Sequence, residues 1–185
     1  MVLPSYYLAP VAYYRQLLHS AEVRIEVCDH YAKQTLRNRC WIDSPSGPLA
    51  LTVPVEKAEG KQMMRDVRIS DHGNWRHQHW QALVSSYRQS PFFEFYADDF
   101  APFYSRRWTF LADYNEELMQ LICRLLEVEV TTERTTAYSA SPDWQPDPTS
   151  ARPYYQMFAS RHGFLPDLSI VDLLFNMGNE SILYL

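Results

Sequence analysis

Apolar and polar residues alternate in parts of the chain, as they do in strands that bury one face. Residues 2–3 are a short apolar pair that Pro4 ends, and residues 23–27 alternate between apolar and charged side chains. Both segments are predicted strands. Two further short strands are predicted at 66–69 and 128–130, where β-branched residues stand among polar ones.

A β-hairpin is predicted between the second and third of these strands. Residues 39–42 and 49–55 flank a turn-forming sequence at 44–47, and apolar residues alternate along the second segment. Because proline has no N–H to donate within a sheet, Pro54 places the second hairpin strand at an edge or at its end.

Apolar residues at helical spacing predict helices in the remaining segments. The first follows the aromatic segment 5–10, and Asn74 can cap a second one at about 75–88. A longer helix is predicted at about 106–126, with leucine and isoleucine on one side.

The last predicted helix has clear boundaries. Ser169 stands at its N-cap, and Asp172 occupies the position that Glu takes in a capping box. Gly178 follows the last apolar residue and is a typical helix stop.

This order of elements predicts an α/β fold with a mostly parallel or mixed sheet, a β-hairpin and covering helices. Because the strands are short, α+β is the alternative. A chain of 185 residues is expected to form one domain, residues 1–185. Prolines and serines gather at about 139–153, which predicts a loop within this domain.

Composition places the chain among globular proteins, with 46% apolar and 21% charged residues. No window approaches the ~20 apolar residues of a membrane span. The net charge of −5 argues against a nucleic-acid partner. Cys28, Cys40 and Cys123 lack CxxC spacing, which suits reduced thiols, so a cytoplasmic location is expected.

Several catalytic signatures are missing from the sequence. The five glycines do not build the loops that hold dinucleotides or nucleoside triphosphates, and no GxSxG surrounds a serine nucleophile. His77 and His79 fall on opposite faces of a helix, so with His72 they predict no zinc site. His79 is expected to pack beside Trp75 and Leu83 instead. No metal is predicted, and the cofactor is left unknown.

The densest group of polar side chains follows the strand at 23–27. Residues 30–39 include three cations, Lys33, Arg37 and Arg39. α/β folds bind ligands at strand ends, where arginine can hold phosphate or carboxylate with two hydrogen bonds and lysine adds a point charge. A binding site for an anionic group is therefore predicted, and a solvated basic loop is the alternative.

Asn38 is a further candidate. If residues 38–42 form a strand, Asn38 faces the same side as Cys40 and Ile42, so its amide needs a partner or a ligand.

Four stretches together resemble the WbqC-like protein family over most of the chain. They are Pro4-Ser5-Tyr6-Tyr7, Lys33-Gln34 with Arg37-Asn38-Arg39, Leu51-Thr52-Val53-Pro54-Val55, and Leu168-Ser169-Ile170-Val171-Asp172-Leu173-Leu174-Phe175-Asn176-Met177-Gly178. The resemblance implies a bacterial protein associated with surface polysaccharide (O-antigen) biosynthesis, for which a glycine or aminoacyl transferase role has been suggested.

Two functions are weighed on these grounds. The first is a transferase acting on an anionic small molecule, such as an activated amino acid, an acyl group or a nucleotide-sugar. Its candidate residues are Asp29 or His30 for proton transfer, Lys33, Arg37 and Arg39 for the anionic group, and Tyr6, Tyr7 and Trp41 for the acceptor, with Asn38 as a further substrate-binding residue.

The second is a non-catalytic binding or assembly protein with a protein partner or a second copy of itself. The aromatic content of 15% suits an interface as well as a cleft. Clustered cations at a strand end favour the enzyme.

Overall fold

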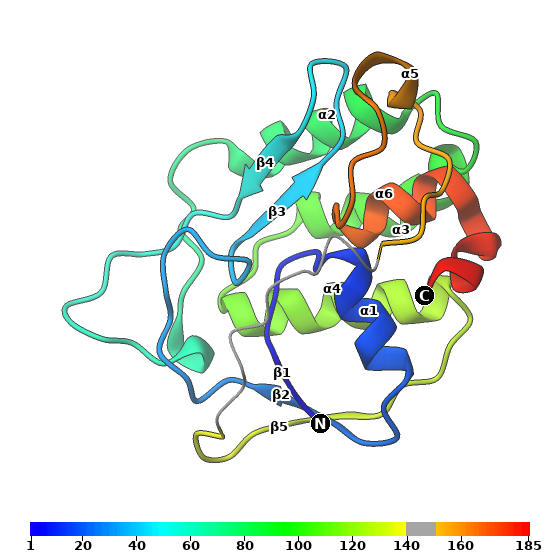
Figure 1. Cartoon of the computed structure of the whole chain (residues 1–185). Helices are drawn as coiled ribbons and strands as arrows, with labels where there is room; N and C mark the ends of the chain where they lie inside the picture. Colours follow the sequence, from blue (N-terminus) through cyan, green and yellow to red (C-terminus); the bar gives the residue numbers. More distant parts are fainter. Residues whose placement is uncertain (140–150) are drawn as a thin grey trace.

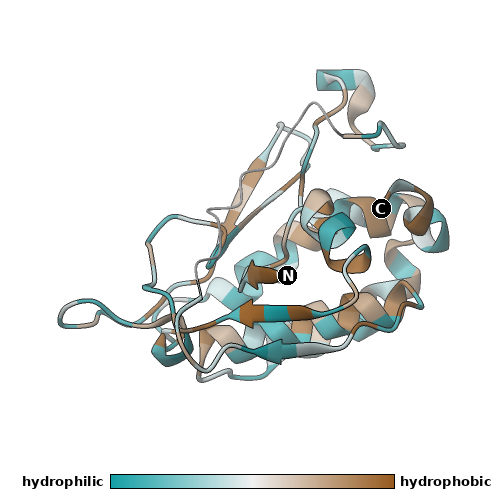
Figure 2. Ribbon diagram, turned by 60° about the horizontal axis from the view of Figure 1, so that its bottom comes forward, coloured by the Kyte–Doolittle hydropathy of each residue, from teal (hydrophilic) through white to brown (hydrophobic). Residues whose placement is uncertain are grey.

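Three parallel strands form one layer of the fold. The computed structural model describes residues 1–139 and 151–185. The strands β1 (Val2–Pro4), β2 (Val23–Glu26) and β5 (Thr132–Arg134) pair in the order β1-β2-β5 (Figure 1). Ile25 of the central strand β2 pairs with Leu3 on one side and Arg134 on the other. Apolar and polar segments alternate along β2 (Figure 2).

One face of this sheet is covered by two helices. α1 (Val11–Leu18) connects β1 to β2, and α4 (Leu111–Leu125) precedes β5. Ile25 borders the same small cavity as residues of both helices, so both lie on the Ile25 face. Arg24 projects to the opposite face and is exposed. This alternation explains why the strand pattern was readable in the sequence.

Three other helices form an aromatic cluster. They are α2 (Trp75–Tyr87), α3 (Phe93–Ser105) and α6 (Ile170–Met177). The Phe175 ring centroid lies 5.2 Å from that of Tyr87, 5.1 Å from Phe93 and 5.3 Å from Phe100. Edge contacts of this kind are favourable for aromatic rings beyond the area that they bury.

The hairpin and the start of α6 connect the sheet layer with the aromatic cluster of α2, α3 and α6. β3 (Arg39–Ile42) and β4 (Leu49–Thr52) are antiparallel. The Ser169 N–H donates to the Trp41 carbonyl at 2.8 Å, and the Ile170 N–H donates to the Ala9 carbonyl at 2.9 Å. The remaining short elements are the 3₁₀ helices η1 (Met64–Asp66) and η3 (Gly178–Tyr184) and the helix α5 (Ala159–His162).

The fold class, the first two strands, the hairpin and the last helix are confirmed. Ser169 caps α6 by accepting a hydrogen bond from the Val171 N–H, and Gly178 ends the helix. The capping box is only half formed, because the Asp172 carboxylate binds other side chains. The helix at about 75–88 is also confirmed, although Asn74 makes no side-chain cap.

Two strand predictions were wrong. At 66–69 the chain leaves η1 and makes only isolated bridges, one of them between Arg68 and Phe110. The strand expected at 128–130 is displaced to β5, because Glu127 turns the chain out of α4 with a positive φ and pairing with β2 begins at Thr132.

The predicted helix at about 106–126 begins later, at Leu111. Phe110 is extended because it pairs with Arg68, so residues 106–110 separate α4 from α3. The pattern did not predict α3, whose apolar residues are aromatic and whose interior contains Pro102.

Most of the loop predicted at about 139–153 lies outside the described residues, including Pro142, Pro146 and Pro148. Within the described residues, no helix is long and apolar enough to cross a membrane.

The Gly178→Ala substitution is predicted to destabilise the protein. Gly178 has a φ of +57°, and a Cβ there would lie 2.6 Å from the Phe92 ring. Gly47→Ala is the matched control, because Gly47 also has positive φ but no atom within 4 Å of its Cβ position. Gly178→Ala should cost about 1–3 kcal/mol more than the control in urea unfolding, through overpacking. Equal costs would contradict this account.

Candidate functional site

The ends of β1 and β2 lead into a group of polar side chains, four of which, Ser5, Asp29, Arg37 and Asn115, are joined by hydrogen bonds. We call it the strand-end site, and its members are Ser5, Asp29, Tyr31, Lys33, Arg37, Asn38, Arg39 and Asn115. It lies where ligands bind in parallel α/β sheets, outside the carboxyl ends of the strands.

An ion pair between Asp29 and Arg37 is the centre of the strand-end site. Arg37 Nε donates to Asp29 Oδ2 at 3.1 Å, and Nη2 donates to the same oxygen. The two side chains are 11% and 12% exposed, so water screens this pair less than a surface pair. The pair holds the two candidate segments, 29–31 and 37–39, against each other.

Asn115 of α4 connects this pair to the first strand. Its Nδ2 donates to Ser5 Oγ at 3.2 Å and to the Arg37 carbonyl at 2.9 Å. Asn38 is buried as predicted, and its Nδ2 donates to the Val53 carbonyl at 2.9 Å. The helix, the hairpin and the β1 loop therefore meet at Arg37.

The outer part of the strand-end site is cationic. Lys33 is exposed, and Arg39 is half-buried with its Nε donating to Thr52 Oγ1 at 2.9 Å. Burial raises the pKa of Tyr31, while the positive charges of Arg37 and Arg39 lower it. Both guanidinium groups therefore act on the Tyr31 hydroxyl. Within the described residues, Lys33 and Arg39 have no acidic side chain as a partner.

The remaining predicted residues lie around this group. His30 is exposed next to Asp29, and Trp41 is 42% exposed on the hairpin face that Arg39 shares. Tyr6 is buried and borders a cavity of about 10 Å³, room for about one water, that Ser5 and Asn115 also line. The catalytic and binding roles of all these residues stay predictions.

Tyr7 is fully buried, and its N–H donates to the Leu36 carbonyl at 2.9 Å. Its hydroxyl lies 3.0 Å from His79 Nδ1 and 3.0 Å from the Tyr104 hydroxyl. Burial lowers the pKa of His79 to about 4, so this histidine is neutral at pH 7. His79 packs 5.1 Å from Trp75, which confirms its predicted position in the core.

Sequence reasoning missed two residues near the strand ends. Glu26 is fully buried, and its carboxylate accepts hydrogen bonds from the Thr135 hydroxyl at 3.0 Å and from the backbone N–H groups of Cys28 and Ser139. Asn115 was the other. For Glu26 the sequence offers a weak signal, a charged residue at the end of an alternating strand. For Asn115 nothing in the helical pattern indicates a role in the site.

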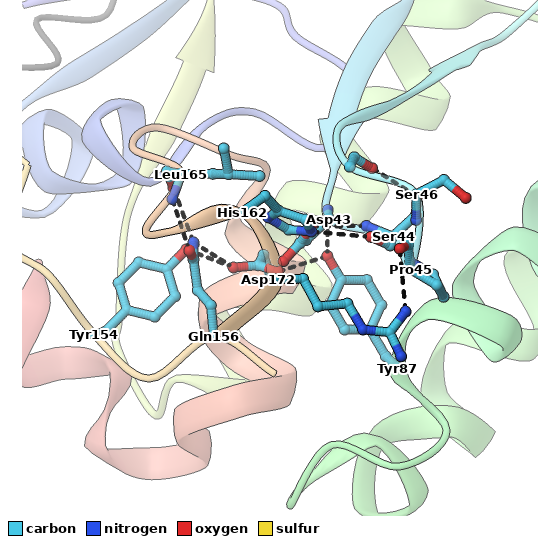
Figure 3. A network of polar contacts seen from close by, with 12 residues as sticks. Asp43, Ser44, Pro45, Ser46, Tyr87, Tyr154, Gln156, His162, Leu165 and Asp172 are labelled. Carbon is cyan, nitrogen blue, oxygen red and sulfur yellow. Dashed lines mark hydrogen bonds and ion pairs between the residues drawn. The ribbon is translucent and has the colours of Figure 1, made fainter. Parts of the chain in front are cut away.

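A second polar group lies at the hairpin turn, shown in Figure 3, and we call it the buried carboxylate cluster. It consists of Asp43, Tyr87, Tyr154, Gln156, His162 and Asp172. The hydroxyls of Tyr87 and Tyr154 each donate to Asp172 at 2.7 Å, and Gln156 Nε2 donates at 3.0 Å.

Within the described residues, no cationic side chain pairs with Asp172, and the imidazole of His162 is the one basic group paired with Asp43. His162 Nε2 lies 3.3 Å from Asp43 Oδ1, and the Asp43 N–H donates to the Tyr87 hydroxyl. The pKa of Asp172 is raised to about 6, chiefly by burial and also by the charge of Asp43, while the hydrogen bonds from Tyr87, Tyr154 and Gln156 lower it. The pKa of Asp43 is also raised by burial. The cluster fastens the segment 154–165 to α2, α6 and the hairpin.

Metal ligands are not gathered at either group. Across residues 1–139 and 151–185, no three His, Cys, Asp or Glu side chains are placed to hold a metal ion.

Comparison with known proteins gives a family match. The profile of the WbqC-like protein family matches residues 5–146. An uncharacterized protein of Mycobacterium tuberculosis, Rv1507c, is 30% identical over 196 aligned positions, which cover 84% of this chain and 83% of that protein. No solved structure matches the chain significantly.

The Asp172→Asn substitution is predicted to change how stability depends on pH. Because the folded pKa is raised above the ordinary value, Asp172 favours folding at low pH, and that contribution is lost as the pH rises through about 6. The wild type should therefore gain up to about 3 kcal/mol relative to Asp172→Asn between pH 7 and pH 4. Urea unfolding across this range measures it. The exposed Asp98→Asn variant is the control, and a pH-independent difference for Asp172→Asn would contradict the prediction.

Proposed function

The chain belongs to the WbqC-like protein family, and on this premise we propose that it is a small bacterial transferase of surface polysaccharide (O-antigen) biosynthesis. The anionic part of its substrate binds at the strand-end site. The family resemblance favours glycine or another aminoacyl group as the group transferred.

The unpaired cations carry this proposal. Lys33 and Arg39 have no acidic partner within the described residues, although the chain as a whole is acidic. Both belong to the segment 29–39, which follows β2 and contains the Asp29–Arg37 pair. An arginine that is half-buried without a counter-charge is well suited to a phosphate or carboxylate, which it can bind with two hydrogen bonds.

Proton transfer is assigned to Asp29, with His30 as the alternative. In a transfer reaction the acceptor nucleophile forms a bond to the transferred group, the leaving group departs with its electron pair, and the nucleophile loses a proton. Arg37 holds Asp29 Oδ2, while Oδ1 has no hydrogen-bond partner in the described structure. Of the two carboxylate oxygens, the buried Oδ1 is thus the one that has no donor and keeps its lone pairs for this proton. His30 is exposed at the edge of the same site.

Loss of either free cation is predicted to weaken anion binding. Lys33→Ala and Arg39→Ala each remove a charged donor, which is worth about 1.5–3 kcal/mol to a bound anion. The affinity for pyrophosphate, measured by titration calorimetry, should fall about 10- to 100-fold. The matched control is Lys57→Ala, which removes an exposed lysine from a loop elsewhere and should bind as the wild type does.

Unchanged affinity in both Lys33→Ala and Arg39→Ala would contradict the proposed site. Binding that depends on both residues, without turnover of any donor and acceptor pair tested, would favour the non-catalytic binding protein instead.

A further inference from the structure

We propose that the anionic substrate of the strand-end site is a nucleotide, whose planar base stacks on Trp41 while Arg39 binds its phosphate. This inference rests on the proposed function, because it names the substrate class of the same anion site. It moves Trp41 from the acceptor, where the sequence placed it, to the donor. The argument comes from the outer face of the hairpin.

The outer face of the hairpin presents Arg39 and Trp41 side by side. The two residues lie two positions apart on β3, so their side chains point to the same face with a spacing of about 7 Å. Cys40 and Ile42 alternate with them and are buried in the core. Trp41 is 42% exposed and Arg39 is half-buried, so a ligand can reach both side chains from solvent.

The indole ring of Trp41 is left uncovered by its neighbours. Its partner on β4 is Ala50, whose methyl group is too small to cover the ring. Among the described residues, no aromatic ring and no cation packs on Trp41. Trp75, Trp80 and Trp108, in contrast, each pack on another ring. Trp41 is therefore a flat apolar surface that is open to a planar ring of a ligand.

Arg39 is held in place but keeps donors free for an anion. Its Nε donates at 2.9 Å to the hydroxyl of Thr52, its partner on β4. Within the part of the chain that the structure describes, its two terminal nitrogens make no hydrogen bond and no ion pair. A guanidinium that is fixed at Nε can bind a phosphate with these two nitrogens.

The positive charge that lacks a partner lies on the Trp41 side of Arg37. Burial raises the pKa of Tyr31, and the charges of Arg37 and Arg39 both lower it, so both guanidinium groups act on its hydroxyl. Arg37 is paired with Asp29, whereas Arg39 has no acidic partner among the described residues. The anionic part of a ligand is therefore expected at Arg39, with the rest of the ligand free to extend over Trp41.

A nucleotide matches both groups. Its base can stack on one face of an aromatic side chain without being enclosed, which suits an exposed indole better than an aliphatic chain does. Its phosphate supplies the negative charge for Arg39. Because every base has a π face, this surface selects for a base without selecting which one. The net charge of −5 disfavours a nucleic-acid strand, so a single nucleotide is the expected ligand.

The test compares AMP with ribose 5-phosphate, which has the same sugar and phosphate but no base. Titration calorimetry on the wild type should show that AMP binds at least about tenfold more tightly, because only AMP can stack. Oligoadenylate is included to distinguish a free nucleotide from a nucleic-acid strand. These comparisons need no variant and do not depend on whether a substituted protein folds.

Two substitutions at one position locate the effect. Trp41→Leu keeps an apolar side chain but removes the planar ring, so it should lower the affinity for AMP about tenfold and leave that for ribose 5-phosphate unchanged. Trp41→Phe keeps a ring and should retain most of the affinity for AMP. Phe95→Leu is the matched control, because it removes a ring that is 82% exposed on α3, and it should change the affinity for neither ligand.

The outcomes separate this inference from the proposed function. Equal affinities of AMP and ribose 5-phosphate in the wild type, both lowered by Arg39→Ala, overturn the assignment of a base and leave the anion site standing. A preference for AMP that survives Trp41→Leu overturns the role of Trp41. Tighter binding of oligoadenylate than of AMP, per nucleotide, overturns the inference in favour of a nucleic acid. If AMP, ribose 5-phosphate and pyrophosphate all fail to bind, the proposed function is overturned and the inference with it.

Discussion

A carboxylate that is buried without a cation, Asp172, holds α2, α6 and the segment around residue 154 together. Asp172 is fully buried, and its hydrogen bonds come from the neutral groups of Tyr87, Tyr154 and Gln156. Neutral donors stabilise a buried charge only when several of them are held at hydrogen-bond distance. The positions of α2, α6 and the segment around residue 154 are therefore coupled. The Tyr87 hydroxyl extends this coupling to the hairpin by accepting from the Asp43 N–H.

The same helix start also positions the sheet. Ser169 and Ile170 donate to the backbone of the hairpin and of the loop that follows β1. That loop contains Ser5, and the hairpin begins at Arg39, so α6 helps to bring both sides of the strand-end site together. At Asp172 both carboxylate oxygens have donors, but elsewhere in the buried carboxylate cluster Asp43 Oδ2 and His162 Nδ1 have no hydrogen-bond partner within the described residues. Around Arg37 the same is true of Asp29 Oδ1, Asn38 Oδ1 and Asn115 Oδ1. Both polar groups therefore combine paired and unpaired buried atoms.

The sequence predicted those parts of the fold in which one local pattern decides the outcome. Strand β2 and the hairpin follow from alternation, and the beginning and end of α6 follow from Ser169 and Gly178. The predictions were wrong where pairing with a distant segment of the chain determines the backbone conformation. Phe110 is extended because it bridges Arg68, more than forty positions away in the sequence. The candidate residues between positions 29 and 39 were visible as a local cluster, but Asn115 enters the site only through the packing of α4 against the sheet.

Charge explains how an acidic protein can bind an anion. The net charge of −5 repels anions at long range, but mobile ions screen charges over about 8 Å at physiological ionic strength. Along the segment 29–39 three cations, Lys33, Arg37 and Arg39, outnumber the one acidic residue, Asp29. Attraction therefore begins only near the site, and long-range steering contributes little to the association rate. Selectivity must therefore come from contacts that the ligand makes within the site, such as the two hydrogen bonds that an arginine offers to a phosphate or a carboxylate.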